Sequence, residues 1–229
     1  RQLYAEACEI VVRYQSARDP GRGSSVPSFG RHLDAALFAY KADFFASWSV
    51  AAALGRTATP NERRVVEEAF SEIADVAAAA PQRLAHRDFQ SSNVLLRGER
   101  PPGQRLCMID LQGAFLAPPE YDLVCLLHDS YVELGDEEVA LQLARVRPAL
   151  PDAPDPESFA RRFDLLTLTR KGKDHALFLY AAKTRGMHDY LRFLPPTVRS
   201  LRSAALRRAG ESPRLARLAE LVLQLPESS

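Results

Sequence analysis

The sequence predicts a predominantly helical α+β fold, and three observations support this prediction. Apolar residues recur at helical spacing over most of the chain. Two short apolar runs, 94–96 and 106–109, flank a Pro-Pro-Gly turn and are typical of a β-hairpin. The composition, 46% hydrophobic and 26% charged over 229 residues, is that of a globular protein large enough to bury a substantial core.

Helices separated by loops are expected before the hairpin. Residues 3–14 place their apolar side chains on one face of a helix. Residues 19–28, rich in Pro, Gly and Ser, predict a connector; a phosphate-binding loop is the alternative, but no strand precedes it. Residues 33–48 predict a long helix whose aromatic stripe faces the core. Thr59 and Glu62 then form a capping box that starts a further helix.

After the hairpin the chain is again expected to be helical. Pro118-Pro119 opens a helix predicted to continue through Tyr131, and Asp155-Pro156 opens another. Further helical patterns cover residues 159–185, 187–194, 198–208 and 213–225. The arginines of residues 199–217 could indicate a nucleic-acid surface. A solvated amphipathic helix face is favoured, because Ala and Leu alternate with the arginines at helical spacing.

The residues most informative about chemistry surround the hairpin. His86-Arg87-Asp88 is followed by Asn93, and a hydrophobic run then ends in Asp110. This order and spacing are typical of kinases that transfer the γ-phosphoryl group of ATP to a hydroxyl. A carboxylate such as Asp88 can receive or orient the proton of the acceptor. Asn93 and Asp110 supply the hard oxygen ligands that Mg²⁺ prefers, and the hairpin should bring them to one edge. The alternative is a polar turn in which Asp110 caps the next element.

Composition argues against several other classes of function. A net charge of +1 provides no overall field for nucleic acid or an anionic membrane. No apolar run is long enough to span a bilayer, and no signal peptide is visible. Cys8, Cys107 and Cys125 lack metal-ligand spacing, and the last two are predicted to be small buried hydrophobic residues. A reducing cytoplasm is therefore the expected compartment.

The segments HRDFQSSNVLL and MIDLQGAFLAPPEYDLVCLLHDSY resemble the aminoglycoside phosphotransferase and choline kinase superfamily, and within it the anomeric kinases of N-acetylmuramate and N-acetylglucosamine. The resemblance implies that residues 1–229 form the C-terminal lobe of a protein-kinase-like fold, with ATP and Mg²⁺ as cofactors. The superfamily's N-terminal ATP-binding lobe has no counterpart here, so we expect it to be truncated or lost. Without that lobe, the chain is expected to hold ATP poorly.

The same resemblance assigns roles to individual residues. Asp88 would be the catalytic base or would orient the sugar hydroxyl, and Asn93 and Asp110 would hold Mg²⁺. An apolar floor under the nucleotide would come from Leu95 and Ile109. Support of the catalytic loop would come from three residues: His86, Arg87 and Asp122. Asp122 is also favoured by the helix dipole in its own right.

Candidates for the sugar site are less specific. His128, Asp129 and Tyr131 lie one to two turns beyond Asp122 on the predicted helix and are candidates to line the acceptor site. A solvent-facing position is the alternative for Asp129, and a core position is favoured for Tyr131. Arg170 and Lys171 could meet an acidic sugar, although a surface role is favoured for both.

The sequence as a whole favours an ATP-dependent kinase that phosphorylates a small molecule, most specifically the anomeric hydroxyl of an amino sugar. Two alternatives are an aminoglycoside or choline-type kinase and a catalytically silent kinase-like binding module.

Overall fold

A computed structural model describes residues 1–19, 21 and 26–227. The chain forms two compact units. The first comprises residues 1–33 and 78–163, and the second comprises residues 34–77 and 164–229. Across the described ranges, none of the helices combines the length and apolarity needed to cross a bilayer.

Two helices of the first unit pack against α1 (Gln2–Gln15). They are α5 (Tyr121–Leu127) and α6 (Asp136–Val146), and the beginning of α7 (Pro156–Arg185) also belongs to this unit. The buried residues of α1 recur at helical spacing, as its sequence predicts. They are Ala5, Glu6, Ala7, Cys8, Val11 and Gln15.

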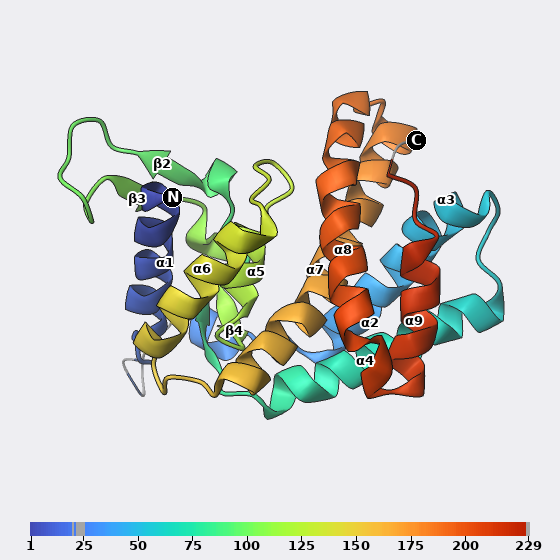
Figure 1. Cartoon of the computed structure of the whole chain (residues 1–229), viewed down its shortest axis with the longest axis horizontal. Coiled ribbons are helices and arrows are strands. Elements are labelled where there is room, and N and C mark those ends of the chain that lie inside the picture. The colour runs from blue at the N-terminus through green and yellow to red at the C-terminus, as the bar shows by residue number, and fades with distance from the viewer. Residues whose placement is uncertain (20, 22–25, 228–229) are drawn as a thin grey trace. The chain divides into compact units, whose positions relative to one another are not determined.

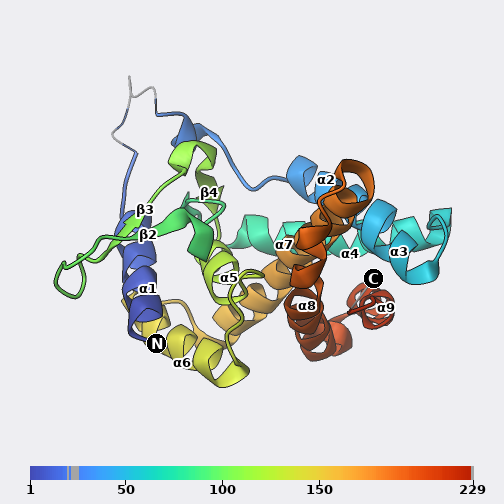
Figure 2. The same cartoon turned by 90° about the horizontal axis from the view of Figure 1, so that it is seen from above.

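Two small antiparallel sheets complete the first unit. The predicted hairpin is present: β2 (Val94–Leu96) pairs with β3 (Leu106–Met108), and Figures 1 and 2 show it beside α1. β1 (Arg83–Ala85) pairs with β4 (Phe115–Ala117), and this second sheet was not predicted. Strands of three residues are too short to show the alternation that marks a strand in sequence.

The second unit is entirely helical over its described residues. It contains α2 (Ala35–Phe45), α3 (Ala51–Leu54), most of α4 (Pro60–Ala79), the remainder of α7, α8 (Leu194–Arg208) and α9 (Pro213–Leu223). The capping box is confirmed, because the Thr59 backbone N–H donates to Glu62 Oε2 at 2.7 Å and the Glu62 N–H donates to Thr59 Oγ1 at 3.3 Å.

The helix predicted over residues 33–48 is interrupted. A π-helical turn over Ala46–Val50 separates α2 from α3. In the connector predicted over residues 19–28, residues 20 and 22–25 lie outside the described ranges, and a 3-10 helix begins at Pro27.

The arginines of α8 and α9 are largely ion-paired. Arg207 and Arg208 both contact Asp164, at 2.6 and 2.8 Å, and Arg217 contacts Glu68 at 3.1 Å. These arginines therefore join helices to one another within the second unit. This agrees with the favoured interpretation as an amphipathic helix face and gives no support to a nucleic-acid surface.

Other local features also differ from the predictions. Arg170 and Lys171 are not surface residues: they are 3% and 1% exposed, and both form ion pairs with Asp174. Cys107 is half-buried because it lies on an open hairpin face, whereas Cys125 is buried as predicted. The α6 helix was not predicted at all.

Candidate active site

The Asp88 loop connects β1 to β2 in the first unit. Arg87 has a left-handed backbone conformation, with φ of 83°, which is uncommon outside glycine. The Asp88 side chain is partly exposed, and its Oδ2 lies 3.8 Å from Nε of Arg87. The loop therefore presents a carboxylate to solvent from a backbone that costs free energy to maintain, and such backbones concentrate at functional sites.

Asp122 holds this loop from inside the protein. Its carboxylate is 0% exposed and accepts hydrogen bonds from the backbone N–H groups of His86, at 2.6 Å, and Arg87, at 3.0 Å. The Tyr14 hydroxyl donates a third hydrogen bond at 2.5 Å. Burial raises the pKa of the Asp122 carboxyl, and these hydrogen bonds oppose the rise. The geometry fits the predicted role of Asp122 as a support for the loop.

His86 links the loop to the far strand of the hairpin. Its buried ring contacts the carbonyl oxygen of Ile109 through Nε2 at 2.7 Å and lies 5.6 Å from the ring of Phe89. Asp110 follows Ile109 directly. The His86 contact therefore ties the position of Asp110 to that of the Asp88 loop, which fits the predicted shaping role of His86.

The hairpin register brings Asn93 and Asp110 to one edge. The Ile109 N–H donates to the Asn93 carbonyl at 3.0 Å, so Asn93 lies opposite the residue that precedes Asp110. Asn93 Nδ2 donates to the backbone carbonyl of Asp88 at 2.8 Å, which leaves its Oδ1 as the atom available to a cation. Asp110 is exposed and left-handed, with φ of 68°, and Gln112 donates to its carboxylate.

A carboxylate and an amide oxygen at one edge fit a Mg²⁺ site that is completed by phosphate oxygens and waters. Among the described residues, no group of three His, Cys, Asp or Glu side chains could hold a metal ion. In the predicted site, Asn93 and Asp110 would hold the ion together with phosphate oxygens of the nucleotide.

The two residues predicted to form the nucleotide floor lie on one face of the hairpin. Leu95 pairs with Cys107 across the hairpin, and Ile109 follows Cys107 by two residues. Side chains two residues apart on a strand lie on the same face, so all three point to the same side. Leu95 is 49% exposed and Ile109 is 39% exposed. Exposed apolar side chains beside a candidate metal edge are suited to cover a planar base.

The three acceptor candidates do not lie on the predicted helix. α5 ends at Leu127, so His128, Asp129 and Tyr131 follow the helix and are not part of it. Asp129 is buried, and its carboxylate accepts from the N–H of Ser91 at 2.7 Å and from the N–H of Tyr131 at 2.9 Å. The bond to Tyr131 is the local side-chain turn that competes with helix.

Asp129 thus supports the turn that precedes Asn93, and it is not solvent-facing. His128 lies against Phe163 with a centroid distance of 4.8 Å. Contact of these three residues with an acceptor stays a prediction.

Two contributors to the site were missed. Tyr14 was assigned only to the core face of its helix, and nothing in the sequence links it to Asp122, 108 residues away. Cys125 Sγ donates to the Arg87 carbonyl at 3.3 Å, although it was predicted to be simply a buried hydrophobic residue. Long-range contacts of this kind leave no local signal.

The sequence of the chain is similar to those of known phosphotransferases. Residues 1–160 match the phosphotransferase enzyme family. The chain is 29% identical over 232 residues to an N-acetylmuramate/N-acetylglucosamine kinase of Pseudomonas putida, covering 97% of this chain and 62% of the relative. It is 30% identical over 230 residues to the kinase of the same description from Neisseria meningitidis, covering 97% and 64%.

A third relative of that description, from Caulobacter vibrioides, is 31% identical over 110 residues, which is 48% of this chain and 30% of the relative. The chain thus spans less than two thirds of the length of the relatives that it matches over nearly its whole extent. With the family match covering residues 1–160, the predicted resemblance is confirmed, and the chain belongs to the phosphotransferase enzyme family.

Proposed function

We propose that this chain carries the catalytic and acceptor-binding part of an ATP-dependent kinase acting on the anomeric hydroxyl of an amino sugar, such as N-acetylmuramate or N-acetylglucosamine. One observation carries the proposal: Asp122 and His86 fix the Asp88 loop to the hairpin edge that bears Asn93 and Asp110. The sugar class is suggested by the names of the relatives.

The residues have distinct roles in this proposal. Asp88 orients the acceptor hydroxyl and receives its proton, because it is the partly exposed carboxylate of the loop. Asn93 and Asp110 hold Mg²⁺, whose charge offsets that of the phosphates. Leu95 and Ile109 support the base of the nucleotide. Most of the rate enhancement would come from positioning and fixed charge.

The proposed location is the cytoplasm. The reaction consumes ATP, and the three cysteines Cys8, Cys107 and Cys125 are all free, which suits a reducing compartment.

A screen of acceptors tests the proposal. ADP release by a full-length protein that includes this chain and the ATP-binding lobe is measured with N-acetylmuramate, N-acetylglucosamine, an aminoglycoside and choline, and ³¹P NMR identifies the phosphorylated oxygen. We expect turnover of an amino sugar with phosphate at the anomeric position. If only choline or only the aminoglycoside were turned over, that compound class would replace amino sugars as the proposed acceptor. If no acceptor were turned over, a silent binding module would be favoured.

A matched pair of variants separates chemistry from folding. Asp88→Asn should lower kcat by roughly 10²–10⁴-fold while the melting temperature stays unchanged. Asp43→Asn alters an exposed aspartate of the second unit and should leave kcat unchanged. Equal activities of the two variants would remove Asp88 from the mechanism.

A further inference from the structure

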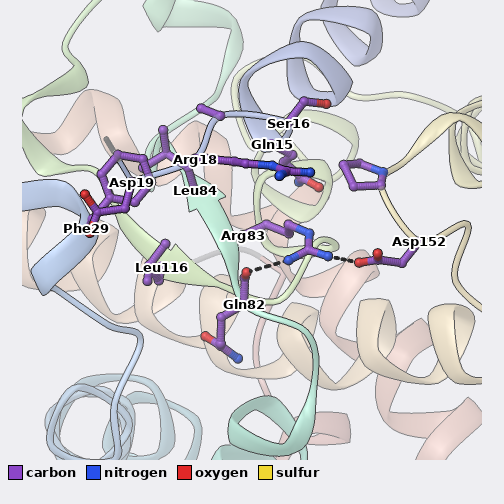
Figure 3. A pocket seen from close by; sticks show the side chains of 12 residues that line it. Gln15, Ser16, Arg18, Asp19, Phe29, Gln82, Arg83, Leu84, Leu116 and Asp152 are labelled. Carbon is purple, nitrogen blue, oxygen red and sulfur yellow. Dashed lines mark hydrogen bonds and ion pairs between the residues drawn. The ribbon is translucent and has the colours of Figure 1, made fainter. Parts of the chain in front are cut away.

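A cavity of about 520 Å³ lies in the first unit, and none of the catalytic candidates lines it. Figure 3 shows it between the end of α1, the start of β1 and the turn at Asp152. Its volume is in the range of sites that bind small molecules. The lining residues are Gln15–Asp19, Phe29, Gln82–Leu84, Leu116, Pro151 and Asp152.

Charges of both signs line the described part of the cavity. Arg18 and Arg83 carry positive charge, and Asp19 and Asp152 carry negative charge. Arg83 is ion-paired with Asp152, and Asp19 Oδ1 accepts a hydrogen bond from the N–H of Gly21 at 3.0 Å. Among the described lining residues neither sign is in excess, which suits a ligand without net charge.

The polar groups include both donors and acceptors. Arg18 lines the cavity, and its guanidinium carries several N–H donors. Gln15 is 2% exposed, and its Oε1 has no hydrogen-bond partner among the described residues, while its Nε2 donates to the Pro119 carbonyl at 2.8 Å. Arg83 Nε likewise has no acceptor.

A hydroxyl group both donates and accepts, so it can donate to an acceptor such as Gln15 Oε1 or accept from a donor such as Arg83 Nε. Both atoms are closed to solvent, so side chains around them must shift before a ligand reaches them.

Apolar side chains also line the cavity. In Figure 3, Phe29 and Leu116 lie to the left of Gln15 and Arg83. The half-buried ring of Phe29 offers an aromatic face, and Leu84 and Leu116 extend the apolar surface. An aromatic face combined with planar Arg, Asp and Gln side chains suits a ligand whose ring has apolar faces and a rim of hydroxyl groups.

We propose that this cavity is a saccharide-binding site for a neutral sugar, separate from the acceptor site at Asp88. The proposal goes beyond the proposed kinase reaction, because no step of it requires Asp88, Asn93 or Asp110. Phe29 supplies the stacking face, and Arg18, Arg83 and Gln15 supply the hydrogen bonds.

Photolabelling tests the site directly. A diazirine derivative of N-acetylglucosamine is crosslinked to the intact chain, and the labelled peptides are mapped by mass spectrometry. We expect label on the peptides containing residues 15–19, 29 or 82–84. Free N-acetylglucosamine should compete for this label, and inorganic phosphate should not. Label confined to the Asp88 loop, or equal competition by phosphate, would overturn the proposal.

Variants make the test specific. Phe29→Leu keeps an apolar side chain but removes the ring, and it should lower labelling of the cavity roughly tenfold. Phe29→Tyr should restore labelling, and Tyr40→Ala, which alters an exposed aromatic residue of the second unit, should not change it.

Unchanged labelling in Phe29→Leu, with its melting temperature retained, would refute the site. Asp88→Asn must keep cavity labelling while losing turnover, so failure of the kinase proposal and failure of this one give different results.

Discussion

Replacing Asp122 with Asn probes the support of the catalytic loop. The carboxylate accepts three hydrogen bonds in a site closed to solvent, two from backbone N–H groups of the loop and one from Tyr14. An amide of the same shape has only one oxygen. In either orientation its NH₂ group faces at least one donor that previously had an acceptor, and a buried donor left unpaired costs about 1–3 kcal/mol.

The expected result for Asp122→Asn is a loss of about 3 kcal/mol in the free energy of unfolding, together with a fall in kcat, because the backbone that carries Asp88 is released. Urea denaturation followed by circular dichroism measures the first quantity, and ADP release measures the second.

Tyr14→Phe is the matched variant. It removes one donor and leaves both backbone N–H groups paired, so the free energy of unfolding should fall by less, about 1.5–2 kcal/mol. An unfolding free energy of Asp122→Asn within about 0.5 kcal/mol of the wild type would show that these hydrogen bonds do not hold the loop.

Three further perturbations address other parts of the structure. The half-buried thiol of Cys107 lies on the proposed nucleotide face and should react with maleimide, whereas the two buried cysteines should not. ATP with Mg²⁺ should slow the reaction of Cys107. Equal rates of this reaction with and without ATP would place the nucleotide elsewhere.

Burial lowers the pKa of His175 from 6.5 to about 4, so its contribution to stability is present above pH 6.5 and lost as pH falls toward 4. The free energy of unfolding should fall by on the order of 3 kcal/mol over this pH range, and His175→Asn should flatten its dependence on pH. Gly172→Ala places a Cβ 3.1 Å from the buried ring of Phe45. The destabilisation from overpacking, about 1–3 kcal/mol, should outweigh the gain of about 1 kcal/mol in helix propensity. An increased melting temperature would contradict this.

Local patterns predicted much of this structure. The periodicity of α1 and the capping box of α4 are local signals, and both elements begin within a residue of the expected position. The hairpin was predicted because a Pro-Pro-Gly turn separates two apolar runs, and its register then brought Asn93 and Asp110 together.

Features that depend on distant residues were not predicted. The β1–β4 sheet joins segments about 30 residues apart, and Tyr14 reaches Asp122 across 108 residues. The end of α5 was misplaced because the Asp129 carboxylate accepts hydrogen bonds from the N–H groups of Tyr131 and of the distant Ser91, and the second of these contacts is invisible in a periodic pattern. Arg170 and Lys171 were assigned to the surface from their charge, while their burial is made tolerable by Asp174.

Metal binding tests the central claim most directly. Mn²⁺ serves as a paramagnetic substitute for Mg²⁺, and its dissociation constant in the presence of ATP is measured by electron paramagnetic resonance. Asp110→Asn should weaken Mn²⁺ binding by roughly tenfold or more, since it removes a charged ligand, while Asp88→Asn should bind Mn²⁺ like the wild type and yet fail to release ADP. Unaltered Mn²⁺ affinity in Asp110→Asn, or turnover by Asp88→Asn at the wild-type rate, would contradict the assignment of these residues.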